Sequence, residues 1–248
     1  MSNLSYMQKA TDRGQLQIHV TTERGFFPIK DASIRLSYTG NPTEIIEELS
    51  TDISGQTAAV ELPAPPLEYS MEPSEFQPYS EYTIQVNASG YRPINISGIS
   101  VLPDKTSIQN VRMETATVEN PLERNIVITA NTLYGNFPPK IPEDEIKPMT
   151  ESGEIVLSRV VIPEYVIVHD GPPSDSSAND YYVRYRDYIK NVASSEIYAT
   201  WPDAALRANI LAIMSFTLNR VYTEWYRNKG YDLSLIHISE PTRLLSIS

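Results

Sequence analysis

One carboxylate of the chain has neighbours that suit proton transfer. Glu196 lies in the segment Ala193-Ser-Ser-Glu-Ile-Tyr-Ala-Thr-Trp-Pro202, where small residues precede it and aromatic residues follow it. An aromatic ring packed against a carboxyl group excludes water, and this desolvation raises the pKa of the carboxyl group. A carboxyl group of this kind is suited to general-acid catalysis. From the spacing alone, a helix-terminal glutamate on a solvated face is the more common explanation.

The other candidate groups have simpler structural explanations. Asp170 and Asp175 lie in a loop rich in Gly, Pro and Ser, where Asp forms turns. Asp52-Ile-Ser-Gly55 has too few carboxylates for a calcium loop and predicts a β-turn. His169 follows a strand-like run, which favours packing or capping over catalysis. Four tyrosines could stack on sugar rings, but a half-buried aromatic stripe explains them better; they are Tyr181, Tyr182, Tyr185 and Tyr188.

Composition excludes several classes of function. The 248 residues include 20 Lys and Arg against 31 Asp and Glu, a net charge of −11, which argues against nucleic acid and anionic membranes as partners. There is no cysteine, so disulfides, thiol catalysis and thiolate metal sites are excluded. The histidines are scattered, and we expect no metal or cofactor. No apolar run approaches the ~20 residues of a membrane helix, and the polar leader 1–14 contains no secretory signal.

Residues 15–115 have the pattern of a β domain. Apolar residues alternate with polar ones in several short runs, and turn residues such as Gly40-Asn-Pro separate them. Many short strands with frequent turns predict a small antiparallel sandwich. The expected strands are 15–21, 33–38, 57–62, 82–88, 94–101 and 106–113, with a weaker candidate at 45–51.

Residues 116–157 differ from the β domain in composition. The stretch Pro138–Pro148 is rich in proline and charge, and proline removes backbone donors and fixes φ, so we expect an extended linker there. A short strand or helix is expected at 125–132, before this stretch.

The apolar pattern of residues 158–232 predicts a second, helix-rich domain. A β-type run at 160–168 leads into the loop, and helical spacing of apolar residues follows at 185–197. Thr200-Trp-Pro202 interrupts the helix, and a second helix begins at Asp203 and is expected to stop by Gly230. Apolar residues occupy more than one side of this second helix near its middle, which predicts that it is buried.

We expect the tail 233–248 to be no part of the natural protein. Leu233-Ser-Leu-Ile-His-Ile-Ser-Glu-Pro-Thr-Arg243 is the translation of a transposase-type sequencing adaptor, residue for residue. We expect the genuine sequence to stop near Asp232 and the natural protein to continue beyond it. The tail, with His237, is excluded from any argument about a site.

The segment around Glu196 resembles the signature of the sporulation stage II protein D family. That signature is approximately Tyr-Leu-x-Gly-Val-Val-Ala-x-Glu-Met-Pro-x-x-Trp-Pro-x-Glu-Ala-Leu-Lys-Ala-Gln. Matching positions in this chain are Tyr188, Val192, Ala193, Glu196, Trp201, Pro202, Ala205, Leu206 and Ala208. The wider chain, over residues 14–232, resembles the clostridial spore cortex-lytic enzymes through Ile162–Gly171, Ser215–Tyr226, Leu62-Pro-Ala-Pro, Pro78–Tyr82 and Pro138–Glu143.

The resemblance implies a lytic transglycosylase that acts on spore cortex peptidoglycan. Such an enzyme cleaves the bond between N-acetylmuramic acid and N-acetylglucosamine and leaves a 1,6-anhydromuramic end. Glu196 matches the catalytic glutamate, which would protonate the glycosidic oxygen and then accept the proton of the muramic C6 hydroxyl. One carboxylate suffices because the sugar supplies its own nucleophile. The residues expected to contact substrate are Tyr188, Ser195, Tyr198 and Trp201.

The resemblance also implies a fold and a zymogen. The expected fold is α+β and multidomain, with a transthyretin-like or carboxypeptidase-regulatory-like sandwich followed by the truncated helix-rich catalytic part. The sandwich would belong to a pro-region that a subtilisin-like germination protease removes, and Met149–Ile155 is the expected cut. Localisation would be the spore, in the cortex or coat region.

The chain departs from the family pattern in two ways, and two other functions are open alternatives to the enzyme. Met214 stands where the family has an arginine, which removes a residue that could bind substrate. The downstream blocks of the family are absent, so we expect the 248-residue chain to be inactive as it stands. Alternatively, the sandwich is a non-catalytic module that binds the cell wall, similar to collagen-adhesin B domains, or the chain is a structural protein of the spore coat.

Overall fold

The computed structural model describes residues 12–72, 76–117, 122–130, 133, 162–171 and 175–222. The chain divides into two compact units. The first contains residues 1–134 together with Tyr198–Trp201, and the second contains residues 135–197 and 202–248. Each unit is described by itself.

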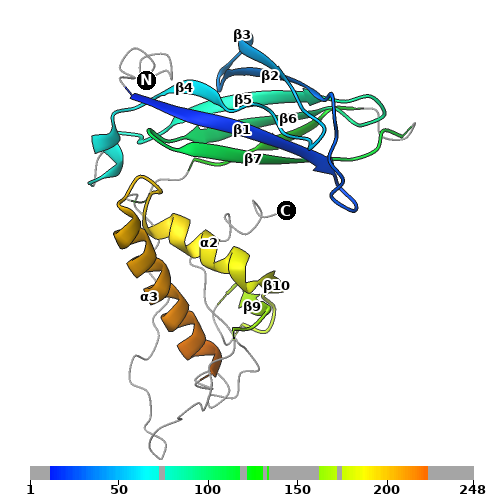
Figure 1. Ribbon diagram of the computed structural model, residues 1–248. Coiled ribbons are helices and arrows are strands. Elements are labelled where there is room, and N and C mark those ends of the chain that lie inside the picture. The colour runs from blue at the N-terminus through cyan, green and yellow to red at the C-terminus, as the bar shows by residue number, and fades with distance from the viewer. Residues whose placement is uncertain are drawn as a thin grey trace, which may run out of the picture. The chain divides into compact units, whose positions relative to one another are not determined.

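The first unit is built from two β-sheets that lie face to face as layers (Figure 1). One sheet has the strand order β4-β1-β7 and the other has the order β3-β2-β5-β6-β8. A short 3₁₀-helix, η1, spans Leu67–Ser70. The strands are β1 (Asp12–Thr22), β2 (Ser33–Tyr38), β3 (Asn41–Ser50), β4 (Val60–Ala64), β5 (Ser80–Asn87), β6 (Ile94–Val101), β7 (Thr106–Met113) and β8 (Arg124–Val127).

Period-two alternation places the apolar residues of both sheets in one core. Leu16, Ile18 and Val20 of β1 are fully buried, and Ile34 and Leu36 of β2 join them in the same cluster. Side chains of a strand alternate between its two faces, so the polar residues between them point away from this core. The expected β domain is therefore confirmed.

A buried tyrosine crosses this core. Tyr82 of β5 is fully buried and its hydroxyl donates to the carbonyl oxygen of Pro63, at 2.6 Å. Its ring stacks on that of Tyr38, with ring centroids 5.3 Å apart. Burial raises the pKa of the Tyr82 hydroxyl, so the group stays a donor and its hydrogen bond links the two sheets.

The expectation of a purely antiparallel sandwich is wrong. β1 pairs with β7 in parallel, and β6 pairs with β8 in parallel, whereas the other pairings of these sheets are antiparallel. Alternation reports which face of a strand is buried and contains no information on strand direction. The sheets are therefore mixed. β8 overlaps the range 125–132, where we expected a short strand or helix within the stretch 116–157. The Pro-rich stretch Pro138–Pro148 and the expected cut at Met149–Ile155 lie outside the described residues.

Three strands occupy their predicted ranges, and the bounds of the other four predicted strands shift by up to four residues. β2, β6 and β7 occupy the predicted ranges, and β1 and β5 begin before the predicted starts. The weak candidate at 45–51 becomes β3, which begins at Asn41, within the predicted turn Gly40-Asn-Pro. β4 begins at Val60 rather than at Thr57. Thr57 is buried, and its hydroxyl oxygen accepts a hydrogen bond from the Ile18 backbone N–H at 3.1 Å. The Thr57 side chain thus accepts a hydrogen bond that a backbone carbonyl oxygen of a paired strand would otherwise accept. The alternation of apolar residues in the sequence cannot predict such a replacement.

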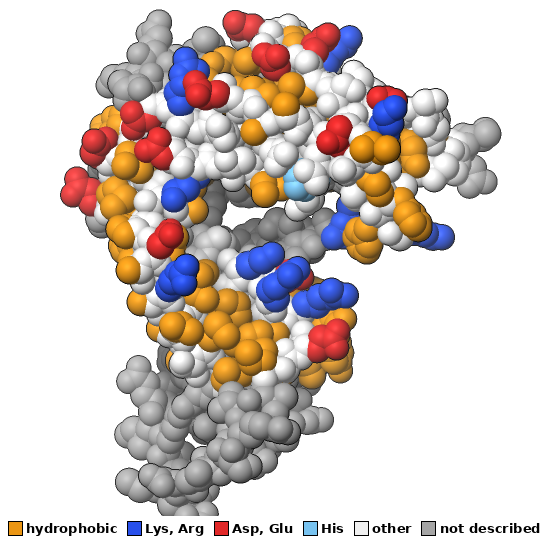
Figure 2. Space-filling view, in the orientation of Figure 1, with side chains coloured by type: hydrophobic (Ala, Val, Ile, Leu, Met, Phe, Trp, Pro, Cys, Tyr) orange, Lys and Arg blue, Asp and Glu red, His pale blue; other side chains and the backbone are white. Residues whose placement is uncertain are grey.

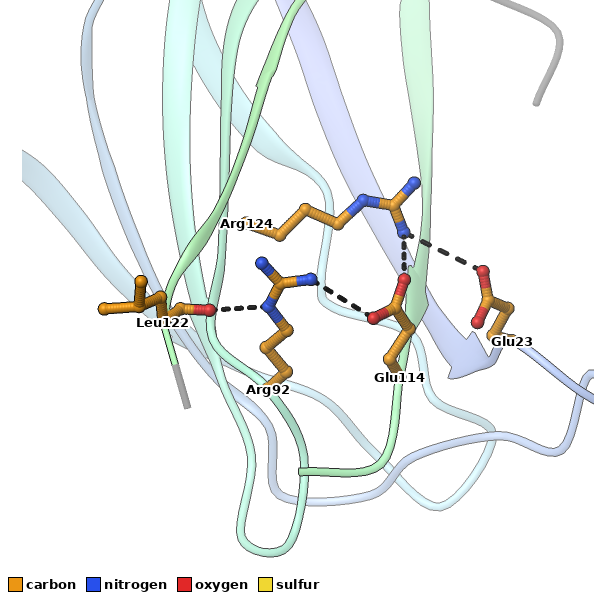
Figure 3. Close-up of polar contacts among 5 residues, drawn as sticks. All are labelled: Glu23, Arg92, Glu114, Leu122 and Arg124. Atoms are coloured by element: carbon orange, nitrogen blue, oxygen red, sulfur yellow. Dashed lines mark hydrogen bonds and ion pairs between the residues drawn. The ribbon is translucent and has the colours of Figure 1, made fainter. Parts of the chain in front are cut away.

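An ion-pair network fastens β8 to the sandwich (Figure 3). Glu114, just after β7, accepts from Arg92 at 3.2 Å with one carboxylate oxygen and from Arg124 at 3.1 Å with the other. Arg92 also donates to the carbonyl oxygen of Leu122. The side chains of Arg92 and Glu114 are largely buried, so their charges are less screened than those of a surface pair.

The second unit contains a hairpin and two helices (Figure 1). β9 (Tyr165–His169) pairs antiparallel with β10 (Asp180–Arg184), and α2 (Tyr185–Glu196) and α3 (Asp203–Tyr222) follow. Both helices begin within a residue of the predicted positions. The core of this unit contains Val166, Val168, Tyr185, Tyr188, Ile189 and Ile213.

The expected burial of the second helix is wrong for the chain as described. Ile213 and Thr217 of α3 are buried, but Leu211 and Phe216 are 61% and 55% exposed. Apolar residues on several sides predict burial only when partners exist for every side, and only one side of α3 packs on the hairpin and α2. Among the described residues, neither helix has the length and apolar character that a membrane crossing requires.

Candidate functional site

Glu196 is the last residue of α2. The helix ends there because Ile197 adopts an extended backbone, and the N–H of Ile197 closes the last turn on the carbonyl oxygen of Ala193 at 3.1 Å. Pro202 then starts the next helix, and its carbonyl oxygen accepts from the N–H groups of Ala205 and Leu206. The sequence therefore places the carboxylate at a helix end, just before a short turn.

The Glu196 carboxylate is exposed and held by one side chain. Oε2 of Glu196 accepts a hydrogen bond from Nδ2 of Asn209 at 3.0 Å. The amide oxygen of Asn209 is buried and has no hydrogen-bond partner among the described residues. Glu196 is exposed, which agrees with the more common explanation of its spacing, a helix-terminal glutamate on a solvated face, and not with the desolvated carboxyl group considered beside it.

Sequence analysis missed Asn209. The available signal was its place directly after the matching position Ala208, where the stage II protein D signature has Gln. Asn and Gln both end in an amide that donates through nitrogen. Asn209 lies on α3, so its bond to Glu196 joins the two helices of the second unit.

Two residues of α2 that we expected to contact substrate, Tyr188 and Ser195, make contacts within their own unit. The Ser195 hydroxyl donates to the carbonyl oxygen of Asn191 at 2.8 Å, one helical turn back. Tyr188 is buried and belongs to the hydrophobic cluster of the second unit. Tyr188 therefore packs in the interior of its unit. Ser195 precedes Glu196 in the sequence, and its hydroxyl group is bonded within the helix.

Tyr198 and Trp201 group with the first unit. Tyr198 is buried, and its hydroxyl oxygen accepts a hydrogen bond from the backbone N–H of Leu133 at 3.1 Å. The indole N–H of Trp201 donates to the carbonyl oxygen of Ser70 at 2.9 Å. The polar atoms of both aromatic side chains are therefore engaged in backbone contacts.

His169 has a structural partner across the hairpin. Its Nδ1 lies 2.8 Å from Oδ1 of Asp180, and the histidine side chain is buried. These residues face each other in the pairing of β9 with β10. The contact bridges the two strands, in agreement with the packing role that the sequence favoured.

The acidic loops form turns, as the sequence predicted. Asp175 accepts from the N–H and the hydroxyl of Ser177, at 2.9 and 2.6 Å, and these bonds lower the pKa of the Asp175 carboxyl group. Asp52 accepts from the N–H groups of Ser54 and Gln56 at 2.8 and 3.0 Å. Within the described ranges, no group of three or more acidic or histidine side chains is arranged to hold a metal ion.

The tyrosine stripe is divided between core and solvent. Tyr185 and Tyr188 are buried in the cluster of the second unit, and Tyr181 packs against that cluster. Tyr182 is exposed, because it lies between Tyr181 and Val183 on a strand whose side chains alternate. The stripe is thus half-buried, as expected, and one ring faces water.

Comparison with known proteins gives no family. No family model matches the chain, and no curated protein matches it. Among solved structures, the TIE protein of Bacillus anthracis is 17% identical with a TM-score of 0.29, and the match covers 42% of this chain and 17% of that one. The minor pilin GBS52 of Streptococcus agalactiae is 14% identical with a TM-score of 0.30, over 53% of this chain and 48% of that one.

A third likeness is to the 5-hydroxyisourate hydrolase of Klebsiella pneumoniae, at 16% identity and a TM-score of 0.28, over 42% of this chain and 92% of that one. The chain therefore spans 17% and 48% of the length of the first two of these structures. At such TM-scores, none of the likenesses assigns a function to the chain. What the structure itself shows is a mostly β-sheet first unit and a second unit with two helices.

Proposed function

We propose that the chain is a precursor fragment of a lytic transglycosylase that degrades spore cortex peptidoglycan during germination. The observation that carries the proposal is the Glu196 carboxylate, which is exposed at the end of α2 and oriented by the Asn209 amide. Both residues lie in the segment that resembles the stage II protein D signature. In this proposal the first unit is a transthyretin-like or carboxypeptidase-regulatory-like sandwich, and the second is the N-terminal part of the catalytic domain.

The proposed reaction requires one carboxyl group that acts first as a general acid and then as a general base. Protonated Glu196 donates its proton to the glycosidic oxygen as the bond from muramic C1 to that oxygen breaks. The resulting carboxylate then accepts the proton of the muramic C6 hydroxyl while O6 forms a bond to C1. No water is consumed, the product is a 1,6-anhydro ring, and the enzyme regains its proton. A hydrogen bond from Asn209 to Oε2 leaves Oε1 of Glu196 available for both transfers.

The proposal includes a zymogen located in the spore. The sandwich would be part of a pro-region that a subtilisin-like germination protease removes by cutting within Met149–Ile155.

The experiment compares the full-length natural protein with two single variants on purified cortex peptidoglycan. Glu196→Gln keeps the shape of the side chain and removes the proton, so release of soluble muropeptides should fall by about 10²-fold or more. Glu164→Gln is the matched control, because Glu164 is an exposed glutamate of the same unit that precedes α2. Equal release by the Glu196→Gln variant and the wild type would show that the proposed function is wrong.

A further inference from the structure

Two phenylalanine rings protrude into solvent at one end of the sandwich. They belong to the turn Glu23–Phe27, named here the Phe tip, which follows β1. Phe26 is 60% exposed and Phe27 is 68% exposed. Neighbouring large apolar side chains that remain in water mark interaction sites more often than single ones do.

The backbone holds the Phe tip in a defined shape. The Thr22 N–H donates to the carbonyl oxygen of Phe27 at 2.9 Å, and the Thr22 hydroxyl oxygen accepts from the Phe27 N–H at 3.0 Å. The N–H of Glu23 donates to the carbonyl oxygen of Met113 at 3.0 Å, which fastens the tip to the end of β7. The two rings therefore lie on a turn that these hydrogen bonds hold in place.

One of these residues has a strained backbone. Phe26 has a φ of +53°, in the left-handed region that residues other than glycine rarely adopt. Gly25 precedes it with a φ of +82°, and a Cβ at that position would lie 2.6 Å from the ring of Phe27. Strain of this kind persists where the surroundings enforce it and is concentrated at functional positions.

The charges around the Phe tip are unbalanced in favour of arginine. The Arg112 guanidinium lies over the Phe26 ring, 4.8 Å from its centroid, and Arg24 of the tip is exposed. The carboxylate of Glu23 is turned to Arg124, at 3.8 Å (Figure 3). Within the described part of the chain, Arg24 and Arg112 take part in no ion pair.

Figure 2 shows basic side chains beside hydrophobic ones at the end of the upper part, where β1 finishes. Local positive charge of this kind is notable in a chain whose net charge is −11. An anionic polymer is repelled by the molecule as a whole and attracted to such a patch. The complementary ligand therefore has carboxylates together with apolar surface.

We propose that the Phe tip binds peptidoglycan glycan as a site separate from Glu196. The apolar C–H face of an amino-sugar ring rests on Phe26 or Phe27, and carboxylates of the muramic lactyl groups or stem peptides accept from Arg24 and Arg112. Guanidinium groups match carboxylates in a two-pronged geometry. The choice of glycan rests on the proposed function, and the tip would hold the precursor on its substrate.

The test measures co-sedimentation of the 248-residue chain with insoluble peptidoglycan sacculi. The double variant Phe26→Asn, Phe27→Ser removes both rings, and Asn tolerates the left-handed backbone at position 26. Affinity should fall about tenfold, because both aromatic faces that would contact the sugar are removed. The control is Ile108→Thr, which alters another exposed apolar residue, on β7.

A second variant separates the charge from the rings. Arg112→Gln should weaken binding to sacculi and leave binding to chitin, a neutral polymer of the same amino sugar, unchanged. Arg35→Gln is the control, because Arg35 is an exposed arginine already paired with Glu48. Unchanged thermal unfolding of each variant shows that the sandwich is intact.

Three outcomes would overturn the inference. They are sacculus binding by the double variant equal to that of the wild type, no sacculus binding by the wild type, and binding of phosphatidylglycerol vesicles in place of sacculi. Failure of the proposed function is a different result. In that case Glu196→Gln has no effect on lysis, while the Phe tip still determines sacculus binding.

Discussion

At the scale of single residues, the account depends on a carboxylate and the amide that orients it. The resemblance to the stage II protein D signature selected Glu196 from the sequence, whereas its spacing alone favoured a solvated helix-terminal glutamate. Its partner was not predictable, because α2 and α3 must pack before Asn209 can reach Oε2. The buried positions of Tyr188 and Tyr198 were hidden for the same reason, since a tyrosine in a motif can face substrate or core.

The Asn209 bond leads to a prediction about catalysis. In the full-length protein, Asn209→Ala should reduce kcat about tenfold, because the freed carboxylate samples unproductive orientations. The same change should alter the free energy of unfolding by less than ~1 kcal/mol, since the bond is exposed. Kinetics and denaturant unfolding measure the two effects. In a Glu196→Gln background the substitution should cost little further activity, and a full additional tenfold loss would contradict the positioning role.

A second prediction at this scale concerns Glu81 on β5. Partial burial raises the pKa of its carboxyl group above the ordinary value of 4.5. The folded state thus favours the protonated form, and the stability from this group is present at low pH and is lost as the pH rises through the folded-state pKa. Glu81→Gln, which is permanently neutral, should therefore raise Tm at pH 7.

The advantage of Glu81→Gln should disappear below pH 4.5, where Glu81 itself is protonated. Thermal unfolding across pH measures this, with Glu47→Gln as the control because Glu47 is exposed on β3. An equal gain in Tm at both ends of the pH range would contradict the assigned cause.

At the scale of elements, the sequence predicted where strands and helices lie better than how they pair. Alternation located β2, β6 and β7, and helical spacing located α2. The parallel partners of β1 and β6 come from chain segments far away in the sequence, and no local pattern specifies them. Edge strand β8 was only an open alternative, since four residues, Arg124–Val127, are too few for a clear period.

The ion-pair network around β8 gives a prediction about stability. Glu114→Ala removes the shared carboxylate from two partly buried guanidiniums, Arg92 and Arg124; Arg124 keeps its contact with Glu23, and Arg92 loses its ion pair. An unpaired, partly buried charge costs about 1–3 kcal/mol, and denaturant unfolding of the chain should show a loss of this size. Glu48→Ala, which breaks an exposed pair with Arg35, should cost less than ~1 kcal/mol. Equal effects of the two variants would contradict the role of burial.

At the scale of the whole molecule, a β-sheet unit and a unit of one hairpin and two helices divide the proposed tasks. The first has an extensive core and the Phe tip, and the second contains the candidate catalytic carboxylate. Periodicity predicted strands within residues 15–115 and helices within residues 185–222, because the first alternate with period two and the second have helical spacing. The exposed apolar side chains of α3 were not predicted, since the sequence shows that a residue is apolar without showing whether a partner covers it.

The central claim is that Glu196 drives an intramolecular ring closure on muramic acid. The most direct measurement is mass spectrometry of the muropeptides that the full-length protein releases from cortex peptidoglycan. The account predicts 1,6-anhydromuramic ends with the wild type and their loss with Glu196→Gln. Reducing muramic ends from the wild type, or anhydro ends that persist in the Glu196→Gln variant, would contradict it.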